Sequence, residues 1–133
     1  MSVACYKSEG TSMQPFLRDG DELIVNTAPA ASYEVGDIVL YRSPVYAKPV
    51  AHRVVGVSAA PEMFVVRADA CPSMTETIPR ESIIGRVDYL KRSSAVIQVG
   101  GTRTTAMFNR VVARWYPAVL AARAAAARML SRR

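Results

Sequence analysis

The sequence is poor in the residues that build metal sites and disulfide-stabilised folds. It has two cysteines, Cys5 and Cys71, which could pair or stay free but are too few for a disulfide framework. They form no Cys-x-x-Cys motif and no cluster with histidine, so we expect no metal and no other cofactor. The chain has a single histidine, His52, and a histidine-dependent reaction would therefore have one candidate base.

Long apolar segments are missing as well. No run approaches the roughly 18 to 20 residues that span a bilayer. Lys7 and Glu9 interrupt the N-terminus, where a signal peptide needs its apolar region. We therefore expect neither a transmembrane helix nor a signal peptide in this chain. The expected location is cytoplasmic, or peripheral at the cytoplasmic membrane.

Negative charge is missing from the C-terminal part of the chain. Residues 103–133 carry seven arginines and no acidic residue, whereas residues 1–102 carry ten lysines and arginines against eleven acidic residues. The net charge of +6 therefore comes from the C-terminal part. We divide the chain into a folded domain over residues 1–102, long enough to bury a core, and a basic, alanine-rich tail over residues 103–133.

The pattern of the first part is typical of a β-protein. Short apolar segments alternate with turns rich in glycine and proline, and no helical period occurs before residue 103. We expect a mainly β fold, built as a coiled and partly barrel-like antiparallel sheet. Its strands are expected at residues 2–7, 23–25, 38–41, 50–57, 62–67, 82–90 and 95–99. Residues 2–7 are expected at a sheet edge, and residues 70–80, which include Pro72 and Pro79, in a polar loop.

Ser12 is expected in a short turn. A proline-containing bend follows this turn, and a buried strand follows the bend. Taken alone, such a serine usually caps a neighbouring amide, and a lone histidine in a strand usually bonds to a backbone carbonyl. The order and spacing of the neighbouring segments favour another interpretation. Over about residues 8–90 the chain resembles the type I signal peptidase family of serine endopeptidases, through segments at residues 10–25, 35–41, 50–57, 64–70 and 83–87.

The resemblance implies that Ser12 is a nucleophile and that His52 is its base. A serine hydroxyl needs a base within hydrogen-bond reach, and a neutral imidazole, with a reference pKa near 6.5, can accept its proton near neutrality. The position of His52 holds lysine in bacterial members and histidine in the archaeal and endoplasmic-reticulum branch. Asp69 matches the family's acidic residue, with Ala68 in place of the usual glycine before it, and is expected to orient His52.

The resemblance also implies where the substrate binds. The backbone amide of Ser12 is the first expected donor to the oxyanion. Thr11, or a backbone amide freed by Gly10, is expected to supply a second, because Gly10 replaces the serine that does so in many members. Met13 is expected either to line the pocket before the scissile bond or to belong to the core. A shallow apolar pocket favours small side chains, so the substrate would be an extended peptide or protein segment with an Ala-x-Ala-like site, docked as an added strand.

The tail has a helical pattern, in which Pro117 is expected to kink the helix or to begin a second one. Arg110, Arg114 and Arg128 lie beside an apolar face formed by Met107, Phe108, Val111, Val112, Trp115 and Val119. This face is expected either to pack onto the sheet or to lie in an anionic membrane surface, with Arg110, Arg114 and Trp115 as anchors. Binding of nucleic acid is a third alternative, but the tail has no recognised motif for it.

The sequence therefore predicts a hydrolase, a membrane-associated serine endopeptidase that uses Ser12, His52 and Asp69 to cut a signal- or leader-like segment after a small residue. Self-cleaving repressors share this architecture, but they carry an N-terminal DNA-binding domain and use a lysine base, whereas eleven residues precede Ser12 here. A catalytically inactive binding module, whose basic tail engages a membrane or a partner, is the remaining alternative.

Overall fold

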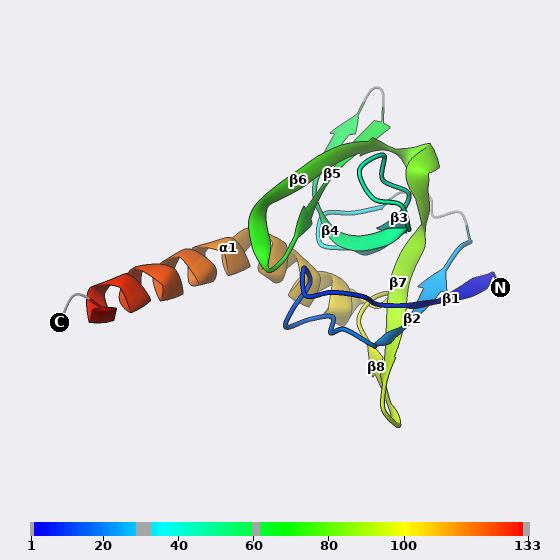
Figure 1. Cartoon of the computed structure of the whole chain (residues 1–133). Helices are drawn as coiled ribbons and strands as arrows, with labels where there is room; N and C mark the ends of the chain where they lie inside the picture. Colours follow the sequence, from blue (N-terminus) through cyan, green and yellow to red (C-terminus); the bar gives the residue numbers. More distant parts are fainter. Residues whose placement is uncertain (1, 29–32, 60–61, 132–133) are drawn as a thin grey trace.

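The computed structural model describes residues 2–28, 33–59 and 62–131. Within these residues, eight strands form one antiparallel sheet that does not close, and one long helix follows it (Figure 1). The main path of the sheet runs β1-β2-β7-β3-β4-β5-β6, and β8 pairs with β7 beside this path. The elements are β1 (Val3–Lys7), β2 (Glu22–Asn26), β3 (Ile38–Tyr41), β4 (Val50–Ala59), β5 (Glu62–Ala68), β6 (Cys71–Pro79), the 3-10 helix η1 (Arg80–Ser82), β7 (Ile83–Arg92), β8 (Ala95–Gln98) and α1 (Arg103–Ser131).

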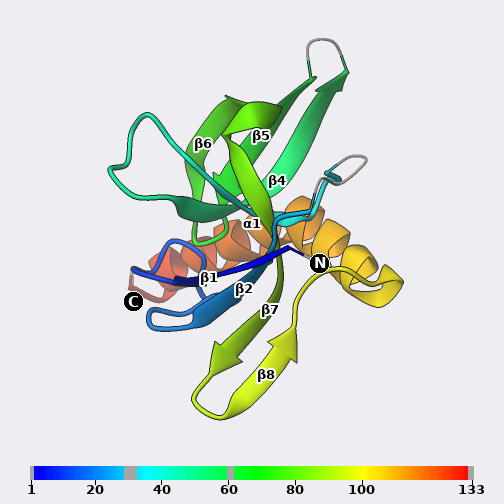
Figure 2. The ribbon, with the colours of Figure 1, turned by 90° about the vertical axis from the view of Figure 1, so that its right-hand side faces the viewer.

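The predicted mainly β fold with a C-terminal helix is confirmed. Each expected strand has an observed counterpart, and β1 lies at an end of the main path, as expected for residues 2–7. Figure 2 shows β7 and β8 as a hairpin that extends beyond the rest of the sheet. Cys5 and Cys71 are both free.

The prediction of a loop over residues 70–80 is wrong, because Cys71–Pro79 form strand β6. Proline removes a backbone donor and is therefore tolerated on edge strands and at strand ends. β6 is an edge strand, and Pro72 and Pro79 stand near its two ends. Its pairing with β5 also shifts register between Arg67 and Ala68, and this irregularity accommodates the segment around Pro72.

The turn that carries Ser12 is anchored in the core of the sheet. Met13 and Leu17, which lie on this turn, are almost completely buried. They pack in an apolar cluster with side chains of β2, β3 and β7, whereas a second cluster lies between β3, β4, β5 and β6. Burial of these two large apolar side chains, each contributing about 1.5 to 3 kcal/mol, anchors the turn to the core of the sheet.

α1 is one helix from Arg103 to Ser131 and continues through Pro117, so the alternative in which Pro117 begins a second helix is wrong. Proline cannot donate the hydrogen bond that the carbonyl four residues earlier would otherwise accept. That carbonyl belongs to Ala113, and Nη2 of Arg67 on β5 donates to it at 2.7 Å. A side chain of the sheet thus satisfies the acceptor that Pro117 leaves free, and it ties the helix to the sheet at that point.

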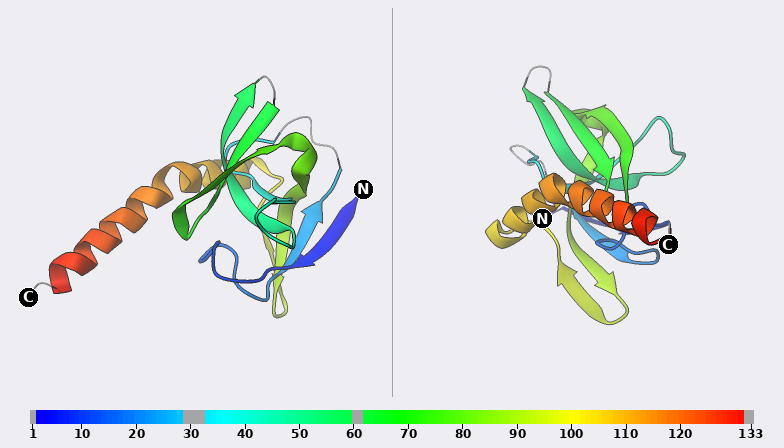
Figure 3. Two further views of the ribbon diagram at one scale, coloured as in Figure 1. Left: turned by 45° about the horizontal axis from the view of Figure 1, so that its top comes forward. Right: turned by 90° about the vertical axis from the view of Figure 1, so that its left-hand side faces the viewer.

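The face of α1 that packs on the sheet is not the expected one. Its buried residues are Asn109, Val112 and Ala113, and the half of the helix beyond them extends past the sheet (Figures 1 and 3). Of the six side chains expected to share the apolar face, Val112 is buried and the other five are exposed. That face as a whole therefore does not pack on the sheet, and it contacts the folded domain through Val112, which is buried, and through Phe108, whose ring meets Phe16 edge to face. Among the described residues, no helix is both long enough and apolar enough to cross a membrane.

Candidate active site

Ser12 and His52 lie next to each other although they are far apart in the sequence. Ser12 is on the turn between β1 and β2, His52 is on β4, and 3.4 Å separates Ser12 Oγ from His52 Nε2. The amide of Ala70 donates to the carbonyl of Ser12 at 2.8 Å, which adds a second restraint on the turn. In enzymes without substrate, hydrogen bonds of this kind are often long and shorten when substrate binds. The fold thus brings the expected nucleophile and the expected base together.

Tyr41, which the sequence analysis did not single out, contacts the other nitrogen of the imidazole. Its hydroxyl oxygen lies 2.8 Å from His52 Nδ1, and both side chains are buried. β3 and β4 are paired so that Val39 lies opposite His52, which places Tyr41 close to the ring from the neighbouring strand. One signal in the sequence pointed to this residue. A tyrosine that ends an apolar, buried strand needs a partner for its hydroxyl group.

Glu76 on β6 lies close enough to Tyr41 to affect the pKa of its hydroxyl group. Burial raises the pKa of the Tyr41 hydroxyl well above its usual value, and the Glu76 carboxylate raises it further, so Tyr41 keeps its proton at neutral pH. Oε1 of Glu76 accepts a hydrogen bond from Ser43 at 2.6 Å. Oε2 of the same carboxylate is buried and finds no hydrogen-bond partner in the described part of the chain. A carboxylate thus stands behind the tyrosine that contacts the histidine.

The expected hydrogen bond between Asp69 and His52 is not formed. In the described residues Asp69 binds Arg53 instead, with Nε at 2.9 and 3.0 Å from its two oxygens and Nη2 at 2.8 Å. Successive residues of a strand point to opposite sides of the sheet, so Arg53 lies on the side away from His52. Asp69 also supports the nucleophile turn, because its amide contacts Sδ of Met13 at 3.3 Å. Asp69 therefore reaches the site through its neighbours.

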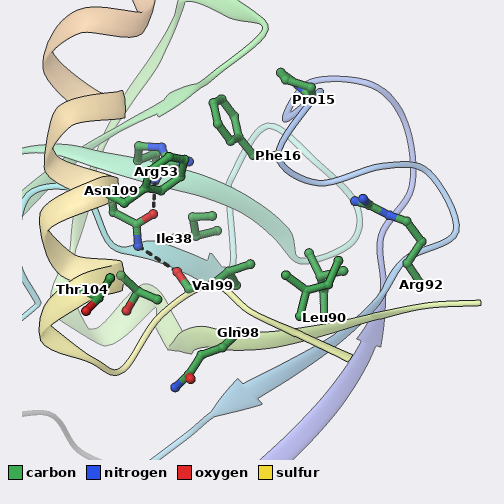
Figure 4. Close-up of a pocket in the computed structure, with 13 residues that line it drawn as sticks. Pro15, Phe16, Ile38, Arg53, Leu90, Arg92, Gln98, Val99, Thr104 and Asn109 are labelled. Atoms are coloured by element: carbon green, nitrogen blue, oxygen red, sulfur yellow. Dashed lines mark hydrogen bonds between the residues drawn. The ribbon is translucent and has the colours of Figure 1, made fainter. Parts of the chain in front are cut away.

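Arg53 also connects the sheet to α1. Its Nη1 donates to the carbonyl of Gly36 at 2.9 Å and to Oδ1 of Asn109 at 3.0 Å, and Asn109 in turn donates to the carbonyl of Val99. Figure 4 shows the hydrogen bonds from Arg53 to Asn109 and from Asn109 to Val99 at one wall of a cavity of about 430 Å³, with Phe16 above them. The strand that carries His52 is thus fixed to the helix through the next residue.

The charge state of His52 follows from its burial. Desolvation lowers the pKa of the imidazole below its usual value of 6.5, and the negative charges of Glu76 and Asp69 partly offset this effect. The imidazole is therefore neutral at neutral pH, which is the form that a general base requires. The same two carboxylates stabilise the imidazolium that forms once a proton arrives.

A groove of about 660 Å³ runs past Ser12 and His52. One wall is formed by the end of β1 and the residues after it, the other by residues 46–52, and Met13, Leu23 and Leu40 line it from the core. Met13 thus lies in the core and in the groove wall at once. Since β1 ends the main path of the sheet, its outer edge offers backbone donors and acceptors to an extended peptide.

The backbone of Gly10 and Thr11, just before Ser12, has the following conformation and hydrogen bonds at the expected oxyanion site. Gly10 has a φ of +86°, a conformation that favours glycine, and its amide donates to Oδ1 of Asp19 at 2.8 Å. Thr11 is exposed, and its carbonyl accepts the amide of Gln14. The expected oxyanion roles of Thr11 and of the Ser12 amide remain predictions.

The expected membrane anchors lie apart from these residues, on α1. Arg110, Arg114 and Trp115 are all exposed.

In the part of the chain that the structure describes, no group of three or more potential metal ligands occurs. The chain matches no protein-family model, no curated protein and no solved structure.

Proposed function

We propose that the protein is a serine endopeptidase of the signal peptidase type, which cuts an extended peptide segment after a small residue. Ser12 is the nucleophile, His52 the general base and acid, and Tyr41 the residue that orients His52. The observation that carries the proposal is the geometry around one ring, with Ser12 Oγ 3.4 Å from Nε2 and Tyr41 Oη 2.8 Å from Nδ1. A serine, an imidazole and an orienting group in this order form the arrangement that activates a hydroxyl.

The reaction follows from the tautomer that this geometry favours. With its proton on Nδ1, His52 donates to Tyr41 Oη and directs the lone pair of Nε2 at Ser12 Oγ. Nε2 takes the hydroxyl proton as Oγ attacks the carbonyl carbon, and then gives it to the leaving amine, so that an acyl-serine remains. His52 next removes a proton from water as the water oxygen attacks the acyl-serine. It then returns this proton to Oγ while the bond between the acyl carbon and Oγ breaks, which releases the new carboxyl terminus and restores the Ser12 hydroxyl.

Two carboxylates have different roles in this proposal. Glu76 stabilises the imidazolium through its negative charge, which raises the pKa of His52 and partly offsets the effect of burial. Asp69 is a positioning residue: its hydrogen bonds hold Arg53, and its turn holds the turn of Ser12. This assignment replaces the direct contact with His52 that the sequence analysis expected of Asp69.

The groove supports an extended substrate with a small residue before the scissile bond. A segment added to the outer edge of β1 would pass Ser12, where Met13 and Ala51 line the groove with apolar surface. Strand addition supplies affinity through the backbone and leaves specificity to the pockets for alternate side chains. Leader-like segments with an Ala-x-Ala site fit these requirements.

The test is cleavage of an internally quenched peptide with an Ala-x-Ala site, together with labelling by a fluorophosphonate. We expect Ser12→Ala and His52→Ala to lower kcat/KM by on the order of 10³-fold or more. Ser58→Ala is the matched control, because Ser58 is exposed at the far end of β4. Full activity of either variant would refute the mechanism. Absence of both cleavage and labelling in the unmodified protein would favour the inactive binding module.

A further inference from the structure

α1 carries an apolar stripe that faces away from the sheet. Its members stand four residues apart, a spacing that places side chains on one face of a helix. We call them the outer stripe; their exposed fractions are 64% for Met107, 51% for Val111, 65% for Trp115 and 48% for Val119. The sheet takes up the opposite face of the helix through Asn109, Val112 and Ala113. The outer stripe is therefore apolar surface that the fold itself does not use.

Positive charge borders the outer stripe. Arg110 and Arg114 are exposed, and each follows a residue of the stripe by three positions, so they lie along one side of it. α1 carries five arginines and no acidic residue, which means that the helix offers these guanidinium groups no carboxylate of its own. Arg132 and Arg133 add to the charge of the sequence but lie outside the described residues.

The combination selects one kind of partner. A second copy of α1 packed on the stripe would bring arginines against arginines with no acidic residue between them, which is unfavourable. Nucleic acid would pair with the arginines but would leave the apolar stripe in water. The surface of an anionic bilayer provides a partner for the arginines and for the apolar stripe, since lipid phosphates bind the arginines and the boundary of the acyl chains takes up the apolar side chains.

We propose that the outer stripe of α1, with Arg110 and Arg114, is a binding site for the surface of an anionic lipid bilayer. Trp115 suits this position, because an indole ring combines a large apolar body with one polar N–H and accumulates at the boundary between lipid and water. The helix then lies in the plane of the surface and holds the sheet against it. This inference stands on α1 alone and does not depend on the proposed endopeptidase activity.

The attachment of α1 gives this site a further consequence. Asn109 binds Arg53, which directly follows His52 on β4, and Arg67 binds the helix at Ala113. These contacts fix the sheet to the packed half of the helix. A bilayer bound to the outer stripe would therefore hold the sheet and its groove in one orientation relative to the membrane surface.

The test uses the full chain with two kinds of vesicle, phosphatidylcholine alone and phosphatidylcholine mixed with phosphatidylglycerol. Because Trp115 is the single tryptophan of the sequence, its emission reports on this site alone. We expect co-sedimentation with the anionic vesicles, accompanied by a blue shift of that emission. The double variant Arg110→Gln/Arg114→Gln should weaken binding about thirty-fold, since each arginine near an anionic surface contributes about fivefold.

The matched control is Arg18→Gln/Arg42→Gln, which removes two exposed charges from the sheet and its turns and should bind as the unmodified protein does. Equal loss of binding in the two double variants would overturn the proposal, because net charge and not the site would then be responsible. Binding without a blue shift, equal binding to both kinds of vesicle, or no binding to either would also overturn it. Mixed-sequence duplex DNA that binds more tightly than the vesicles would assign the site to nucleic acid and refute the inference.

Discussion

The hydroxyl group of Tyr41 provides the sharpest test of how the base is oriented. Tyr41→Phe keeps the ring in its buried position and removes one atom, the oxygen that lies 2.8 Å from His52 Nδ1. The loss matters most in the transition state, where His52 carries two protons and Nδ1–H must donate. A neutral imidazole can avoid part of the cost of an unpaired Nδ1–H by moving its proton from Nδ1 to Nε2. The tautomer with the proton on Nε2 cannot act as a base toward Ser12.

The expected size of the effect follows from the burial of the pair. Leaving a buried donor without its partner costs about 1 to 3 kcal/mol. Applied to the transition state, this corresponds to a loss of roughly 5- to 150-fold in kcat/KM. Because the missing contact strengthens only as His52 becomes charged, kcat should fall by the same factor and KM should stay close to its original value.

The pH profile distinguishes this role from a purely structural one. In the proposed mechanism activity requires neutral His52, so kcat/KM should rise with pH through the pKa of His52, which burial places below 6.5. Removal of the acceptor on Nδ1 destabilises the imidazolium more than the neutral ring, so the pKa falls further. The acid limb of the Tyr41→Phe profile should therefore move to lower pH while the plateau drops.

The assay is peptide cleavage measured between about pH 4 and 8, with thermal unfolding of each variant as the check on folding. Tyr89→Phe is the control, because Tyr89 is half exposed on β7 and should leave both plateau and midpoint unchanged. An unaltered plateau and an unaltered midpoint in Tyr41→Phe would refute the orienting role. A lower plateau with an unmoved midpoint would assign Tyr41 to packing alone.

Two further predictions concern stability. Arg67→Ala removes the donor to the carbonyl of Ala113 and should lower the unfolding free energy by about 1 to 2 kcal/mol. Adding Pro117→Ala should recover part of this loss, because the new backbone amide can donate to the same carbonyl. Urea denaturation of the two single variants and the double variant measures the coupling, and additive effects would contradict the prediction. Hydrogen bonds from Arg92 hold the pKa of Asp21 below its usual 3.8, so its ionised form stabilises the fold above that pH, and this stabilisation is lost as pH falls through the lower, folded-state pKa. The difference in unfolding free energy between the unmodified protein and Asp21→Asn should therefore shrink as the pH is lowered from about 5 toward 2, and a constant difference would count against the pair.

Seven of the eight described strands could be predicted from the sequence, because alternation of apolar residues and the placement of glycine and proline are local properties of the chain. Strand β6 could not, because its two prolines favour a loop and are tolerated in a strand only at the edge of the sheet. The sequence also indicated which residues to examine at the site. The order of the short segments points to Ser12 and His52, and the structure places their side chains in contact. The concentration of arginine in residues 103–133 was likewise readable without coordinates.

Tertiary structure alone decided the partners of those residues. Tyr41 meets His52 because of the register between β3 and β4, and Asp69 meets Arg53 because neighbouring residues of a strand point to opposite sides. Register and facing depend on which strands pair and where their irregularities fall, and no local pattern contains that information. The same holds for α1, where both faces carry apolar residues and the contacts at Asn109 and Ala113 select the one that is buried.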